Sequence, residues 1–249
     1  MEFTYDAYRS LLYLLRTRGY VFTDYHQYAA YPRCVILRHD IDQSLTDAVR
    51  LAEIEAEEGI HSTWFMLLRT DFYNPASAAS QKSIRRLIEL GHEIGLHFDE
   101  VAYAGGSTGS RTRSSTEERI LLEAKILSDI CGQPITTVSM HRPSKATLES
   151  DLRILGIVNS YGKTFFHDFK YLSDSRCHWR EPVEDIIRSG EYARLHILTH
   201  AFWYHEQEQD IRQDVNAFIR AASGERYAQM AENITDLSEI LGEKVLHNE

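Results

Sequence analysis

Cysteine, basic residues and long apolar runs are all scarce in this sequence. Its three cysteines, Cys34, Cys131 and Cys177, form no C-x-x-C pair, which argues against a disulfide framework and against a cysteine-based zinc site. The 249 residues carry 27 Lys and Arg against 37 Asp and Glu, a net charge of -10. Without a basic stripe, nucleic acid and anionic membrane surfaces are poor partners.

No apolar run reaches the roughly 20 residues that span a bilayer, and the first residues lack the basic region and apolar core of a secretory signal. We therefore expect a cytoplasmic protein without membrane insertion. Proline is also rare, with five residues scattered along the chain. No linker or repeat divides the sequence, so we expect a single domain over 1–249, whose oligomeric state stays open. Its expected parts are an N-terminal helical extension over 1–33, a motif-bearing barrel over 34–204 and C-terminal helices over 205–249.

Short apolar runs alternate with helix-like segments for most of the length. One such helix begins at Ser44, with Asp47 as a capping partner, and ends at Gly59. This alternation predicts an α/β fold with a mostly parallel sheet, and its length favours a barrel, whose active residues gather at the carboxyl ends of the strands. The expected strands cover 34–42, 62–68, 93–99, 136–142, 156–161 and 193–199. The expected helices cover 5–18, 44–59, 81–90, 117–131, 206–221 and 225–241, with a loop over 104–115.

Two carboxylates stand at the end of the first central strand. Asp40 and Asp42 are two residues apart, so they point to the same face. Because like charges repel, this pair needs a cation or a shared proton. The alternative is a helix cap or a surface turn.

Histidines end two further strands. His97 closes the segment G-H-E-I-G-L-H and His200 closes L-H-I-L-T-H. With Asp42, His97 supplies the nitrogen and oxygen ligands of a zinc site, and a histidine such as His200 suits proton transfer near neutral pH. Arg142 precedes a proline at the end of another strand, where it could pair with a carboxylate such as Asp40 or form an ordinary salt bridge.

Taken in order, D-x-D, G-H-E-I-G-L-H, R-P and L-x-H resemble the motifs of the polysaccharide deacetylase family, the NodB-homology or carbohydrate esterase 4 group. The resemblance spans about residues 34 to 204. It implies a distorted (β/α)7 barrel with a divalent metal, most often zinc, at its mouth. The R-H-D-I-D opening looks like a divergent branch associated with surface-polysaccharide (O-antigen type) biosynthesis.

The resemblance also implies roles for the matching positions. Asp40 matches the general base, Asp42 the first metal ligand and His97 the first histidine ligand. Arg142 matches the arginine that orients the base, and His200 matches the general acid. The implied reaction removes an N-acetyl group from an amino-sugar-containing carbohydrate by means of a metal-activated water.

The sequence departs from the family at one metal ligand. The family's second histidine, four positions after the first, is replaced here by Val101, which cannot bind a metal. Asp99 and His141 are the candidates for the third ligand, and the sequence leaves the choice between them open. The departure also keeps two other functions open: a hydrolase of another C–N amide bond, with or without a metal, and a non-catalytic sugar-binding protein.

Two residues further along are candidates for substrate binding. Asp174 and Trp179 follow the region of the fifth expected strand. A loop cap is the alternative for Asp174, and ordinary packing is the alternative for Trp179.

Overall fold

A computed structural model describes residues 1–103 and 115–241. The chain divides into two compact units, Met1–Glu208 and Gln209–Glu249, and each is described by itself. The single-domain assignment stays a prediction. The predicted loop over 104–115 lies, except for its last residue, outside the described residues.

The first unit is built on one sheet of eight strands, in which every ladder is parallel. Its strand order is β6-β5-β4-β3-β2-β8-β7, with β1 beside β2. The strands are β1 (Val21–Thr23), β2 (Cys34–Ile41), β3 (Thr63–Leu67), β4 (Glu93–Phe98), β5 (Thr137–Met140), β6 (Val158–Asn159), β7 (Lys170–Ser173) and β8 (Arg194–Thr199).

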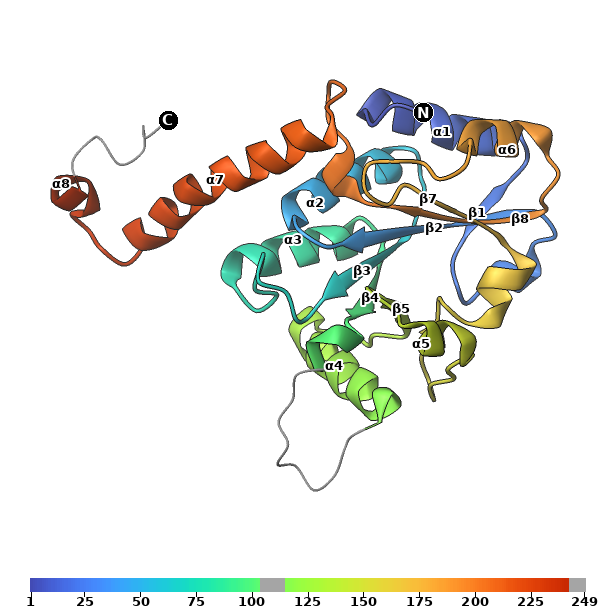
Figure 1. The fold of residues 1–249 in the computed structure, drawn as a ribbon, viewed down its shortest axis with the longest axis horizontal. Helices are drawn as coiled ribbons and strands as arrows, with labels where there is room; N and C mark the ends of the chain where they lie inside the picture. Colours follow the sequence, from blue (N-terminus) through green and yellow to red (C-terminus); the bar gives the residue numbers. More distant parts are fainter. Residues whose placement is uncertain (104–114, 242–249) are drawn as a thin grey trace. The chain divides into compact units, whose positions relative to one another are not determined.

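This order is that of a barrel opened at one seam. Strands β2 to β6 follow one another in chain order, and β8, which ends the strand series, returns to pair with β2. The sheet curls from β2 through β3 and β4 to β5 (Figure 1). Among the described residues, no ladder joins β6 to β7. The topology therefore confirms the predicted α/β class and the distorted (β/α)7 barrel.

Helices connect the strands, and their caps follow from the sequence. The predicted cap of α2 is confirmed, because the Ser44 hydroxyl accepts from the Asp47 amide at 3.2 Å. Helices α2 and α3 contact each other, as do α3 and α4. In the first unit the helices are α1 (Tyr5–Thr17), α2 (Leu45–Glu57), α3 (Ala78–Glu89), α4 (Thr116–Cys131), α5 (Lys145–Glu149) and α6 (Val183–Ser189), with the short turns η1 (Tyr28–Ala30), η2 (Glu100–Tyr103), η3 (Thr164–Asp168) and η4 (Ala201–Trp203).

Several elements differ from the sequence prediction. Strand β1 lies within the expected helical extension, and β7, α5 and α6 were not predicted. In the second unit, the helices expected over 206–221 and 225–241 are instead one long helix, α7 (Ile211–Ala231), followed by α8 (Leu237–Leu241). The expected break was wrong because Gly224 inside a helix costs only about 1 kcal/mol and does not end it. None of the helices in the described ranges is both long and apolar enough to cross a membrane.

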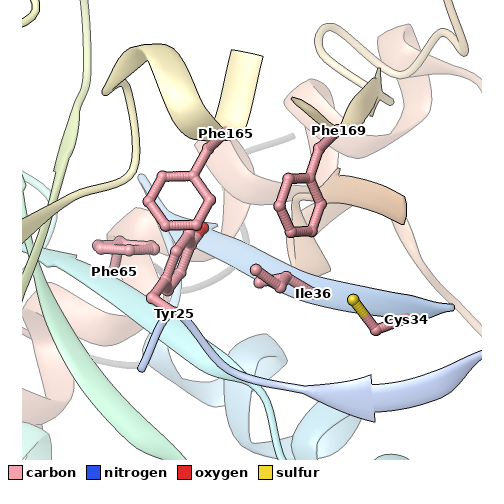
Figure 2. Close-up of a cluster of buried hydrophobic side chains, with 6 residues drawn as sticks. All are labelled: Tyr25, Cys34, Ile36, Phe65, Phe165 and Phe169. Carbon is pink, nitrogen blue, oxygen red and sulfur yellow. The ribbon is translucent and has the colours of Figure 1, made fainter. Parts of the chain in front are cut away.

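A cluster of buried hydrophobic side chains, most of them aromatic, lies inside the barrel below its carboxyl edge (Figure 2). Its members are Tyr25, Cys34, Ile36, Phe65, Phe165 and Phe169. Phe165 and Phe169 reach into it from the segment between β6 and β7, where the ladder is interrupted. The Tyr25 and Phe165 rings meet edge to face with centroids 4.9 Å apart. Ile36 of this cluster, Arg38 and Asp40 are spaced by two along β2 and therefore point to the same face of the sheet. The cluster thus lies on the inner face that also carries the residues described next.

Candidate metal centre and active site

The predicted site residues gather at the carboxyl edge of the sheet. Asp42 directly follows β2, and His97 is the second-last residue of β4. His141 directly follows β5, and His200 directly follows β8. Neighbouring parallel strands hold these ends together, and the edge is the one that the barrel fold predicts for an active site.

Three of these side chains converge on one point. Asp42 Oδ1 lies 3.3 Å from His97 Nε2 and 3.2 Å from His141 Nδ1, and the two imidazole nitrogens are 3.1 Å apart. Ligands bound to zinc at 2.0–2.1 Å in a tetrahedron are about 3.3 Å from one another. Asp42 Oδ1 is buried and makes no hydrogen bond of good geometry within the described residues. The three atoms therefore fit a divalent cation, with nitrogen and oxygen ligands that suit zinc.

Charge in this triad is mutually stabilised. Burial alone would raise the pKa of Asp42, but the neighbouring imidazoles of His141 and His97 hold it well below its usual range. Burial would lower the pKa of His141, and the Asp42 carboxylate outweighs that effect and raises it. A bound cation would take the place of the proton that the two groups otherwise share.

The two candidates for the third ligand lie in different surroundings. His141 lies in the triad, whereas Asp99 forms an ion pair with Arg142. Alternation turns His141 away from Arg142, and the register between β4 and β5 shows that this direction is toward the site. Ser139 pairs with His97, and His141 follows Ser139 by two residues on the same face, with its amide still donating to Phe98 O at 2.9 Å.

The predicted pairing of Arg142 with Asp40 is wrong in this structure. Arg142 stands at the rim, as expected, with its side chain 58% exposed, and pairs with Asp99. Asp40 is instead held by Arg38, whose Nε and Nη2 donate to the two carboxylate oxygens at 2.9 and 2.7 Å. The sequence analysis missed Arg38, although its spacing of two from Asp40 on one strand already places both on the same face.

Asp40 lies beside the triad, with Oδ2 3.4 Å from His97 Nε2. Burial would raise its pKa, but the charges of Arg38 and His97 outweigh burial and lower it. An ionised carboxylate next to a metal position is able to accept a proton.

His200 also lies near Asp42, with its Nε2 3.9 Å from Asp42 Oδ2. Its Nδ1 hydrogen-bonds Asp174 Oδ1 at 2.6 Å, and its amide donates to Asp174 Oδ2 at 3.0 Å. Burial would lower the pKa of His200, but Asp174 outweighs it and raises the pKa to about 9. Asp174 is fully buried and in contact with His200, so its position suits the orientation of the imidazole.

The role of Trp179 in substrate binding stays a prediction. Trp179 is 8% exposed and lines a hollow of about 460 Å³ together with Met1 and residues 178–185. Among the described residues, that lining includes none of the triad.

No protein-family model matches the chain, and no curated protein matches it either. Among solved structures it is similar to a family 4 acetyl xylan esterase from Clostridium thermocellum in complex with a cobalt ion, at 14% identity over 67% of this chain and 73% of that one, with a TM-score of 0.42. It is also similar to the peptidoglycan deacetylase PdaC from Bacillus subtilis, at 14% identity over 80% and 97% of the two chains, with a TM-score of 0.41. A CE4 family pseudoenzyme from Bacillus anthracis matches at 11% identity over 76% and 62%, also with a TM-score of 0.41. The solved structures that the chain resembles thus include members of the family that its motifs resemble, and at these identities no activity or residue role is transferred from them.

Proposed function

We propose that the protein is a metal-dependent hydrolase that removes N-acetyl groups from an amino-sugar-containing carbohydrate or its precursor. The observation that supports this proposal most directly is the triad of Asp42, His97 and His141, whose ligand atoms are 3.1 to 3.3 Å apart. Asp40 and His200 lie next to it, at 3.4 Å from His97 and 3.9 Å from Asp42 respectively. The carbohydrate substrate rests on the sequence motifs alone.

Asp42 Oδ1, His97 Nε2 and His141 Nδ1 would hold the cation, for which we propose zinc. When bound, such a cation lowers the pKa of a water molecule and polarises a carbonyl oxygen. The three side chains come from the carboxyl ends of β2, β4 and β5, the edge at which a substrate would enter.

Asp40 is the proposed general base. Its carboxylate is ionised at neutral pH because Arg38 and His97 outweigh the effect of burial on its pKa. Both oxygens accept from Arg38, yet each keeps a further lone pair with which to take a proton from the attacking water.

His200 is the proposed general acid. With a pKa raised to about 9, its imidazole is protonated at neutral pH. Because Nδ1 bonds Asp174, Nε2 is the nitrogen that can donate a proton to the departing amine. Asp174 would then act as the positioning residue that fixes the ring.

The test combines metal content with acetate release. Protein purified without chelators is expected to hold one zinc ion per chain and to release acetate from N-acetylglucosamine oligomers. Chelation should abolish the release, and added zinc should restore it. His200→Gln should keep the zinc but slow release by about 10²- to 10⁴-fold, the usual contribution of a general acid. The matched control is His61→Gln. His61 is an exposed histidine just before the amino end of β3, whereas the site lies at the carboxyl ends of the strands.

Each alternative function predicts a different result. Zinc-loaded protein that releases no acetate from any N-acetylated sugar would contradict the proposal. Cleavage of small amides that survives chelation would indicate another C–N hydrolase. Glycan binding without turnover, unchanged in Asp40→Asn, would indicate a non-catalytic sugar-binding protein.

A further inference from the structure

Arg38 is a charged side chain enclosed entirely within the barrel. It is 0% exposed, lies on β2 two residues before Asp40, and donates from Nε and Nη2 to both oxygens of that carboxylate. Such a two-bond fork fixes the plane of a carboxylate as well as its position. The pair is thus a rigid unit built into one strand.

Aromatic rings hold the guanidinium itself in place. Its Cζ lies 5.3 Å from the centroid of the Phe65 ring and 4.9 Å from that of Tyr161. Phe65 is the partner of Asp40 in the ladder between β2 and β3. The Tyr25 ring packs edge to face against the Phe65 ring, with their centroids 5.9 Å apart. Both side chains are drawn in Figure 2. Contacts from separate parts of the barrel therefore restrict rotation of the Arg38 side chain.

This restraint matters because two carboxylates compete for one cation position. Asp40 Oδ2 is 3.4 Å from His97 Nε2, almost as near as Asp42 Oδ1 at 3.3 Å. Asp42 has no ion pair with an arginine or lysine among the described residues, whereas both Asp40 oxygens are engaged by Arg38. A free Asp40 carboxylate could rotate toward the cation and become a fourth ligand, which would remove the base and occupy the position that a catalytic site keeps open.

From this geometry we infer that Arg38 is a positioning residue that keeps Asp40 out of the metal's ligand shell and so divides the two aspartates into a base and a ligand. The inference rests on the proposed function and extends it to a residue that the sequence motifs did not assign. Arg142, which pairs with Asp99, does not supply this restraint in the structure.

The test is Arg38→Gln, which removes the fork, together with Arg38→Lys, which keeps the charge in case the first variant fails to fold. Both are expected to slow acetate release by about 10- to 100-fold, the usual effect of losing a partner behind a metal site. Zinc affinity should stay the same or increase, because Asp40 becomes free to bind. In cobalt-substituted protein, the visible absorption spectrum should change, because the Asp40 carboxylate replaces water as the fourth ligand. Arg86→Gln is the matched control, because it removes an arginine that donates twice to Glu53 on the outer helices.

A merely structural role for Arg38 would give a different pattern. Zinc affinity and acetate release falling together, or release equal to that of the parent, would overturn the inference. Adding Asp40→Asn to the Arg38 variants should return the cobalt spectrum to that of Asp40→Asn alone, and a spectrum that stays altered would also overturn it. If the parent binds zinc but releases no acetate, the proposed function fails while the cobalt spectra still test the positioning. A parent that binds no metal would overturn both.

Discussion

Two clusters of histidine and carboxylate lie on opposite faces of the same sheet. The inner cluster is the metal triad with Asp40 and His200. The outer cluster surrounds Glu55 of α2, which is 0% exposed. Strand β2 contributes to both, since His39 points outward to Glu55 while the next residue, Asp40, points inward. The outer cluster consists of Tyr8, His39, Glu55, Ser62, His92 and Thr199.

In the outer cluster, hydrogen bonds use the polar atoms in complementary roles. Glu55 accepts from Tyr8 and Ser62, each at 2.5 Å, and bonds His39 Nε2 at 2.9 Å. His92 Nδ1 accepts from the Ser62 amide at 3.2 Å, and its Nε2 bonds Ala52 O at 3.0 Å. A network satisfied in this way stabilises the contact between helix and sheet and leaves no position for a ligand.

The inner cluster also combines histidines with carboxylates, but in a different arrangement. Asp42 Oδ1 is buried without a hydrogen bond of good geometry among the described residues, and it converges with His97 Nε2 and His141 Nδ1 on one point. The comparison shows that residue type does not separate a structural cluster from a metal site. The distinction lies in whether the polar atoms pair with one another or converge on a shared point.

The largest effect is expected for Glu55→Gln. It removes the charge that pairs with His39, and breaking a buried pair of this kind costs about 3–5 kcal/mol in the free energy of unfolding. Urea unfolding measures this loss. Zinc bound per folded chain should stay equal to that of the parent, because Glu55 does not touch the triad.

The matched control for this variant is Glu53→Gln on the same helix. Glu53 pairs with Arg86 at the surface, where both side chains are more than 40% exposed, so the cost should stay below about 1 kcal/mol. Equal destabilisation by the two variants would remove the structural role given to the outer cluster.

The next effect is a loss of metal affinity with little change in stability, the opposite of what is expected for Glu55→Gln. His141→Ala should weaken zinc binding by about 100-fold or more, since even partners behind the ligands change affinity by 10- to 100-fold. Its effect on unfolding of the metal-free protein should be small, because the His141 side chain is 22% exposed. Calorimetric zinc titration of Asp99→Asn provides the contrast, with a loss below tenfold expected. A larger loss in Asp99→Asn than in His141→Ala would return the third ligand to Asp99.

A further effect is the pH dependence of stability in metal-free protein, where His92 of the outer cluster and His200 of the inner cluster act in opposite directions. Burial lowers the pKa of His92, and the pKa of Glu55 is also lowered, because His39 outweighs burial there. The unfolded chain therefore binds more protons, and this stability is lost as pH falls below about 6.5 for His92 and below about 4.3 for Glu55. His200, with a pKa raised to about 9, contributes stability that is complete below about pH 6.5 and is lost as pH rises toward 9.

Urea unfolding between pH 4 and 9 with chelator present should therefore give a maximum near pH 6.5, with each pKa unit worth about 1.4 kcal/mol. His92→Gln should flatten the acid side, and His200→Gln should flatten the alkaline side. A free energy of unfolding that rises, or falls, steadily from pH 4 to pH 9 would contradict the opposite pKa shifts assigned to His92 and His200.

The sequence was sufficient for those parts of the fold that depend on local pattern. Alternating apolar strands and helices identified most of the parallel sheet, and the alternation of successive residues along β2 placed Asp40 on the face opposite His39. Strands β1 and β7 were missed because short strands carry too little pattern to separate from loops. The Gly95 of G-H-E-I-G-L-H has a reason that only packing reveals, since a Cβ there would come within 2.5 Å of Phe65 and 2.8 Å of Thr137.

By itself, the sequence determined which side chains share a face and which of them stand at strand ends, because alternation and strand termination are local properties of the backbone. Only the tertiary structure decided that Arg38 rather than Arg142 holds Asp40, and that His141 rather than Asp99 completes the triad. Both outcomes depend on how neighbouring strands are aligned and where each one ends. Partners in different strands are set by the curl of the whole sheet, which no single segment encodes.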